Sequence, residues 1–339
     1  MASRTKIVGI YLLKLVGTII FLWWALSQIE DKSLLLDHFY AALKSPAWIA
    51  AGLGLSGAAI LFGALRWHIL LRAQEIEVPF FYVVRLTLYG ALFNLVSIGA
   101  AAGDAAKIFC LIRRRPDKKV EITMSVMVDH LVGFVATSLI FLVFAWGLGT
   151  VTTAKDIGGQ SSFMAATFVL AGGLAFVAFN FFLCTPRMMA FAERKLPRFI
   201  KQPWVQSTTK AIDVFRRNWK MSLSSLAASL VLTSTFFLTF FAALRSLGQD
   251  ASAPQVLSVM PLVDIMASLP ISISGLGVRE RTFDYLLNQL TGIPTGMAVA
   301  ASLIGFLFHS FWGFLGGLAF VTEATRKSTP PSNAADTDE

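Results

Sequence analysis

Ionisable residues directly follow small, helix-weakening residues at two places in an otherwise apolar chain. At residues 94–107 a run of Gly and Ala leads into Asp104 and Lys107, and at residues 268–281 a run of Pro, Ser and Gly leads into Arg279. Charges and broken helices are costly in hydrocarbon and are tolerated where they line a cavity or a substrate path. Matching interruptions in the two halves of a membrane protein therefore indicate a transport site.

Both stretches have the residues of an anion-binding site. A helix that begins inside a membrane protein offers free backbone N–H groups and a positive dipole end to phosphate or carboxylate. Paired guanidinium groups grip phosphate through parallel hydrogen bonds. The predicted substrate-binding residues are Asp104, Lys107, Asp129, His130, Arg279, Glu280 and Arg281, and the predicted hairpin-breaking residues are Asn94, Gly103, Pro270, Gly275 and Gly277.

Each of these charges also has a structural interpretation. The residues of one stretch can pair with each other or extend to the membrane interface. Asp129 and His130 are either a proton relay or a hydrogen-bonded packing element. Asp264, the one acid in its apolar stretch, is a candidate partner for the arginines at 279 and 281, whereas His309 is expected to be a core histidine. Arg66 lies near a predicted helix end, where a charge is ordinary.

Composition places the chain in a membrane. Its 339 residues are 55% hydrophobic and 14% charged, with a mean hydropathy of +0.66, whereas soluble domains are about 25% charged. The net charge of +9 lies in loops between apolar runs, which indicates membrane topology and anionic lipid rather than nucleic acid. We expect neither a metal nor a cofactor.

Apolar runs divide the chain into about six crossing helices and two hairpins. The predicted hairpins are residues 78–112 and 254–291, and each contains one of the interruptions. Basic residues dominate the loops at 113–121 and 187–220, which places both loops and both termini in the cytoplasm. The predicted spans are residues 7–27, 46–71, 120–149, 161–184, 221–247 and 296–322.

The order of these pieces predicts an inverted-topology repeat, an architecture typical of secondary transporters. We predict one all-α polytopic membrane domain at residues 1–325, with halves at about 5–150 and 160–325. A basic cytoplasmic segment at about 186–220 would contact anionic lipid headgroups, and residues 326–339 would form a disordered polar tail. The sequence is compatible with a homodimer.

The two motifs resemble those of a known family. Gly103-Asp104-Ala-Ala-Lys107, followed by Val126-Met-Val-Asp129-His130-Leu-Val-Gly133, is similar to "G-D-x-x-[RK] … V-x-x-[DE]-R-x-x-G". Pro270-Ile-Ser-Ile-Ser-Gly275-Leu-Gly277-Val-Arg279-Glu280 is similar to "P-x-S-x-x-G-[LI]-G-x-R-E". Together they resemble the lysylphosphatidylglycerol synthase transmembrane region, or flippase-like family, with His130 where the pattern has Arg. The resemblance implies a lipid-translocating domain of a bacterial or archaeal cytoplasmic membrane. A chain of this length leaves no room for the soluble synthase domain of fused members.

Three functions follow as hypotheses. The first is a flippase-like transporter, not an enzyme, that moves a phospholipid or lipid-linked amphiphile with a charged headgroup. The second is an integral-membrane enzyme acting on lipid phosphates, which turnover of a lipid by the purified protein would reveal. The third is an accessory subunit, which would not transport alone and would co-purify with a partner.

Overall fold

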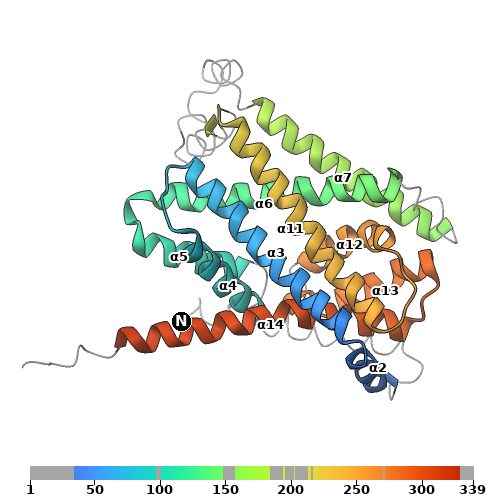
Figure 1. Ribbon diagram of the computed structural model, residues 1–339. Helices are drawn as coiled ribbons and strands as arrows, with labels where there is room; N and C mark the ends of the chain where they lie inside the picture. Colours follow the sequence, from blue (N-terminus) through green and yellow to red (C-terminus); the bar gives the residue numbers. More distant parts are fainter. Residues whose placement is uncertain are drawn as a thin grey trace, which may run out of the picture.

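The computed structural model describes residues 34–96, 101–147, 157–183, 213–214, 217–269 and 272–328, together with residues 194 and 202. Throughout these ranges the regular structure is helical and no strand occurs (Figure 1), which confirms the all-α prediction. The helices are α2 (Leu34–Leu43), α3 (Pro46–Ala73), α4 (Phe80–Val96), α5 (Ala101–Arg114), the 3₁₀-helix η1 (Pro116–Lys118), α6 (Lys119–Phe141), the π-helix η2 (Leu142–Gly147), α7 (Ile157–Leu183), α11 (Trp219–Ser246), α12 (Ala253–Ser268), the 3₁₀-helix η4 (Ile273–Gly275), α13 (Val278–Thr291) and α14 (Thr295–Ser328).

Four helical segments in the described residues are long and apolar enough to cross a bilayer, which takes about 20 residues. They are α3, the segment Pro116–Gly147 that contains α6, α11, and residues Thr295–Ala319 of α14. They coincide with four of the predicted spans. A fifth predicted span is helix α7, whose apolar part, Phe163–Ala175, is shorter.

The remaining predictions on spans fall partly outside the described residues. The predicted span at 7–27 and nearly all of the basic segment at 186–220 lie there, so neither is described. Helix α14 continues to Ser328, which is three residues into the predicted tail at 326–339, and residues 329–339 are again outside the described part.

The chain between the long helices forms two helical pairs. Helices α4 and α5 pack against each other, and so do α12 and α13. The pairs cover residues 80–114 and 253–291, close to the hairpins predicted at 78–112 and 254–291. In each pair the first helix ends, and the second begins, within the stretch of small residues that the sequence marks as an interruption.

We call the junction of α4 with α5 the first tip and the junction of α12 with α13, which includes η4, the second tip. At the first tip, α4 and α5 lie too close together to leave room for a side chain at Gly103. A Cβ atom on Gly103 would lie 2.3 Å from the carbonyl oxygen of Gly90 and 2.6 Å from Oδ1 of Asn94. The backbone N–H of Gly103 donates a 2.8 Å hydrogen bond to the same Asn94 oxygen. Asn94 therefore satisfies one of the free N–H groups that every helix start exposes.

At the second tip, three residues adopt left-handed backbone conformations. Ser274, Gly275 and Gly277 have φ angles of 52°, 72° and 82°, a region that glycine reaches without the steric cost other residues meet. The carboxylate of Glu280 accepts a 2.5 Å hydrogen bond from the Gly277 N–H and so closes the start of α13. The glycines predicted to break this hairpin thus form its sharp turn.

Helices from the two halves of the chain pack on one another in a reciprocal pattern. Helices α3 and α11 lie side by side through the middle of the molecule (Figure 1). Helix α4 packs on α14, and α12 packs on α6 and η2. The contact of α14 with α4 is close because a Cβ on Gly316 would lie 2.4 Å from the Leu88 carbonyl oxygen. Small residues permit such close packing.

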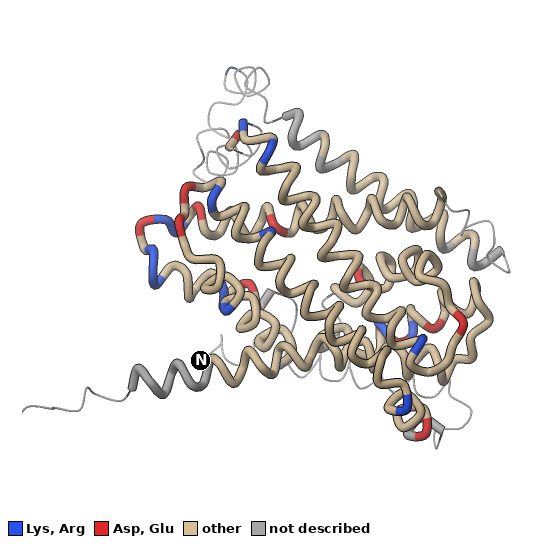
Figure 2. The backbone as a smooth tube through the Cα atoms, in the orientation of Figure 1, with Lys and Arg blue, Asp and Glu red and all other residues tan. Residues whose placement is uncertain are grey.

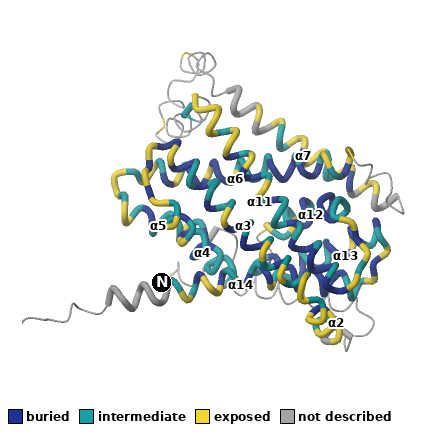
Figure 3. The backbone as a smooth tube through the Cα atoms, viewed as in Figure 1, coloured by how far each residue is buried: buried dark blue, intermediate teal, exposed yellow. Residues whose placement is uncertain are grey.

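The two larger apolar cores of the described residues lie between these helices, whose buried positions are dark blue in Figure 3. One lies among α6, α11, α12, α13 and α14 and contains Phe141, Phe237, Phe240 and Phe283. The other lies among α3, α4, α5 and α6 around Trp67. Each core holds one helical pair against the long helices, so the two tips are fixed in place from both sides.

The close approach at the first tip makes a stability prediction. We expect Gly103→Ala to lower stability by about 1–3 kcal/mol because the methyl group forces α4 and α5 apart. The matched control is Gly54→Ala, because a Cβ on Gly54 meets nothing within 4 Å. Thermal unfolding of the detergent-purified variants measures the difference, and equal midpoints for the two variants would contradict this description of the tip.

Candidate functional site

The two interrupted stretches contact each other. The Ser274 hydroxyl at the second tip donates a 2.7 Å hydrogen bond to the backbone carbonyl of Asn94 at the first tip. These residues are 180 positions apart in the chain. The same Asn94 therefore joins the start of α5 through its side chain and the η4 turn through its backbone.

A small cavity lies where the tips meet, and we name it the inner cavity. Its volume is about 190 Å³, and it is lined by the ends of α4 and α12, the η4 turn, and side chains of α11, α13 and α14. Its apolar lining includes Phe236, Phe240 and Phe306, and its polar lining includes Asn94, Asp264, Ser268, Ser272, Arg279 and His309. Of the predicted hairpin-breaking residues, Gly275 also lines it.

Arg279 presents an incompletely satisfied guanidinium group to this cavity. Its Nη2 donates a 2.7 Å hydrogen bond to the Ser274 carbonyl oxygen, and its Cζ lies 4.8 Å from the centre of the Phe306 ring. Its Nη1 is buried and has no hydrogen-bond partner among the described residues. Buried donors without partners are rare in native proteins. This nitrogen is therefore a candidate hydrogen-bond donor to an anion.

Asp264 and His309 line the same cavity. Within the described residues no hydrogen bond to the Asp264 carboxylate is found, although Asp264 interacts electrostatically with Arg279. His309 packs edge-on against Phe236, with ring centroids 5.4 Å apart, and its buried Nδ1 has no partner in the same ranges. The sequence suggested a satisfied core histidine, whereas the structure places this ring in a polar wall.

A second cavity, which we name the outer cavity, adjoins the first. It has a volume of about 340 Å³ and shares Phe236, Asp264 and Ser268 with the inner cavity. Arg66 and His130 also line it. Asp264 thus lines both cavities, the inner one together with Arg279 and the outer one together with His130.

Beside the outer cavity, Arg66 and Asp129 form a buried ion pair. Arg66 Nε and Nη2 donate to the two carboxylate oxygens of Asp129 at 2.6 and 2.8 Å, and Nη1 donates to Ser229 Oγ at 2.9 Å. Their side chains are only 11% and 6% exposed. With Ser229, the pair joins α3, α6 and α11, while the neighbouring His130 bonds to Asp104 instead of Asp129.

The predicted residues of the first stretch form an ion-paired group. Asp104 lies 2.7 Å from Lys107 Nζ and 2.6 Å from His130 Nε2. Lys107 Nζ also lies 5.2 Å from the centre of the Trp67 ring. Lys107 is thus already paired, and the Gly103 N–H that could have met an anion is bonded to Asn94.

The predicted residues of the second stretch separate. Glu280 is fully buried and accepts hydrogen bonds from the Gly277 N–H and, at 3.2 Å, from the Ser302 hydroxyl. Arg281 pairs with Asp284 at 2.6 Å and does not line the inner cavity. Pro270 lies outside the described residues. Of the two arginines expected to hold an anion together, only Arg279 reaches the cavity.

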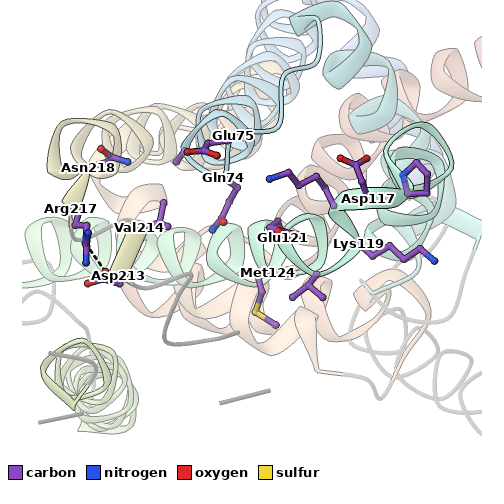
Figure 4. A pocket seen from close by; sticks show the side chains of 14 residues that line it. Gln74, Glu75, Asp117, Lys119, Glu121, Met124, Asp213, Val214, Arg217 and Asn218 are labelled. Carbon is purple, nitrogen blue, oxygen red and sulfur yellow. Dashed lines mark ion pairs between the residues drawn. The ribbon is translucent and has the colours of Figure 1, made fainter. Parts of the chain in front are cut away.

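A larger cavity of about 970 Å³ lies at one end of the molecule, where charged residues gather (Figure 2). Its lining comes from residues 73–75, 116–121, 124, 213, 214, 217 and 218, so described parts of the two basic loops lie at the same end (Figure 4). Its charges are of both signs, and Asp213 pairs with Arg217, whose side chain is 76% exposed. Exposed charges that pair with each other bind a ligand weakly, so we place the candidate site at the inner cavity.

The fold and site together define a multi-pass α-helical membrane protein with charged groups enclosed at its centre. The profile of the family described as the lysylphosphatidylglycerol synthase TM region matches residues 11–317. The chain therefore belongs to this family, as its motifs suggested. A search of curated proteins finds no match.

The Arg66–Asp129 pair makes the second prediction. We expect Asp129→Ala to lower stability by about 3–5 kcal/mol, because it leaves a buried guanidinium without its carboxylate. The control is Asp117→Ala, which removes an exposed partner of Arg115 and should change stability little. Thermal unfolding in detergent measures both, and equal effects of the two variants would show that the Arg66 pair is not structurally important.

Proposed function

We propose that this protein is a flippase-like transporter of the cytoplasmic membrane of a bacterium or archaeon, with both termini cytoplasmic. It moves a phospholipid or lipid-linked amphiphile with a charged headgroup from one leaflet to the other. The headgroup phosphate occupies the inner cavity, while the acyl chains stay in the surrounding lipid.

The observation that carries this proposal is the buried Nη1 of Arg279, which lacks a partner within the described chain. A guanidinium group is always charged and matches two phosphate oxygens with parallel N–H groups. Phosphate binding would satisfy the orphan donor. The cation–π contact with Phe306 and the bond to Ser274 hold the group in place while it does so.

The two helical pairs support re-entrant hairpins. The apolar parts Phe80–Leu95 and Ala253–Ser268 each have about 16 residues, or about 24 Å of helix at 1.5 Å per residue, which is less than the roughly 30 Å hydrocarbon core. A helix of this length that turns back at a glycine-rich tip enters the membrane without crossing it. Irregular backbone at membrane depth is tolerated where protein or a cavity surrounds it.

The reciprocal packing supports an inverted-topology repeat. Under an exchange of the two halves, α3 corresponds to α11, the α4–α5 pair to α12–α13, and α6 to α14. The contacts of α4 with α14 and of α12 with α6 then exchange with each other. Rocking of one half against the other around the tips would alternate access to the inner cavity.

The alternative of an enzyme acting on lipid phosphates would require an activated nucleophile at the site. The Ser272 hydroxyl is buried and has no hydrogen-bond partner among the described residues, and the Ser274 hydroxyl bonds to a backbone carbonyl. A serine nucleophile needs a base within hydrogen-bond reach. Neither serine is activated in this way.

The proposal predicts that Arg279→Ala lowers lipid translocation at least tenfold, because a hydrogen bond to a charged group is worth about 1.5–3 kcal/mol. Proteoliposomes would contain phosphatidylglycerol with a fluorescent acyl chain, and a membrane-impermeant quencher would report the outward-facing fraction. The control Arg115→Ala removes an arginine in the loop before η1, outside both cavities, and should keep the wild-type rate. A wild-type rate in folded Arg279→Ala protein would remove Arg279 from the site.

A further inference from the structure

Asp264 is the acid near the site for which the described residues provide no hydrogen bond. The acids around it are satisfied: Asp129 by Arg66, Asp104 by Lys107 and His130, and Glu280 by Gly277 and Ser302. Asp264 lies one turn before the end of α12, in the wall that the two cavities share. It is therefore placed to respond to what enters either cavity.

The groups that face Asp264 come from four other helices. On the inner side, α13 contributes Arg279 and α14 contributes His309. On the outer side, α3 contributes Arg66, which Asp129 and Ser229 occupy, and α6 contributes His130, which Asp104 occupies. Arg279 is thus the cation available to the Asp264 carboxylate when the inner cavity holds no ligand.

A phosphate in the inner cavity would compete for this cation. Two anions would then share one guanidinium group in a largely apolar space, where like charges close together disfavour each other's ionised form. A carboxylic acid can lose its charge by taking up a proton, whereas a phosphodiester cannot do so near neutral pH. The Asp264 carboxylate is therefore the group that takes up a proton and becomes neutral.

We propose that Asp264 takes up one proton when a lipid phosphate binds Arg279, so that the protein carries a proton together with each lipid. The inference rests on the proposed transport function and names its coupling ion. The carboxylate becomes a neutral acid, the phosphate keeps its single negative charge, and no covalent bond of the lipid changes. The lipid and the proton together carry no net charge across the membrane. The proton leaves Asp264 when the lipid departs and Arg279 again faces the carboxylate.

The outer cavity provides access for the proton. It extends from Asp264 to His130, whose side chain is 63% exposed. Water in this cavity can therefore reach Asp264 without passing the phosphate. This arrangement separates the proton route from the lipid site while keeping both in contact with one carboxylate.

The test uses the same labelled phosphatidylglycerol in proteoliposomes with an alkaline lumen and an acidic exterior. One proton per lipid predicts that wild-type protein concentrates the label in the inner leaflet about tenfold for each unit of pH difference, and that an ionophore that exchanges K⁺ for protons, and so removes the pH difference, abolishes this. Asp264→Asn should still equilibrate the label between leaflets but should not concentrate it. The control Asp250→Asn, at an exposed acid between α11 and α12, should behave as wild type.

The outcomes separate the two proposals. If the wild-type protein moves no label even without a gradient, the transport function itself fails. If it equilibrates the label but never concentrates it, or if Asp264→Asn still concentrates it, coupling through Asp264 is overturned. Should Asp264→Asn fail to fold, a second measurement uses wild-type protein in weakly buffered detergent. It records proton uptake when short-chain phosphatidylglycerol is added. Uptake of about one proton per lipid supports coupling, and no uptake overturns it.

Discussion

Backbone groups that are freed when a helix is interrupted inside an apolar protein need new hydrogen-bond partners, and the centre of this molecule depends on how they find them. The side chain of Asn94 bonds to the start of α5, while its carbonyl group accepts the Ser274 hydroxyl. Glu280 satisfies the start of α13. These contacts hold the two tips together, and the small cavity beside them has a largely apolar lining that includes a few polar side chains. The cavity is a consequence of satisfying the broken backbone.

Charge pairing then determines which charged groups around this cavity are available to bind a ligand or a proton. A buried charge is tolerated when it is paired and hydrogen-bonded, and the described structure meets that condition at Arg66, Asp129, Asp104 and Arg281. Arg279 is hydrogen-bonded through Nη2 but not through Nη1. The Asp264 carboxylate has no hydrogen bond from the described residues. Arg279 and Asp264 lie in one cavity, so binding and coupling are assigned to them while the surrounding pairs hold the helices in position.

Residue types and apolar runs predicted the elements and offered local pairings such as that of Asp104 with Lys107, but they could not predict most partners from distant helices. The runs around 46–71 and 221–247 correspond to α3 and α11, and the small residues before Asp104 and Arg279 correspond to the two turns. Pairing depends on where distant helices meet, which no local pattern records. Arg66 was therefore interpreted as an ordinary helix-end residue although it joins three helices, and Arg281 was grouped with Arg279 although it pairs with Asp284. An arginine within an apolar run is the signal that could have identified Arg66.

The account makes one central claim: a water-accessible cavity between the two tips holds a lipid phosphate. Ser268 lines both cavities, so a Ser268→Cys variant, with Cys110 and Cys184 changed to Ser, reports on this claim in proteoliposomes. A water-soluble thiol reagent should label position 268, and short-chain phosphatidylglycerol should slow the labelling in this variant but not when Arg279→Ala is added. Absence of labelling, or labelling that the lipid does not change, would contradict the account.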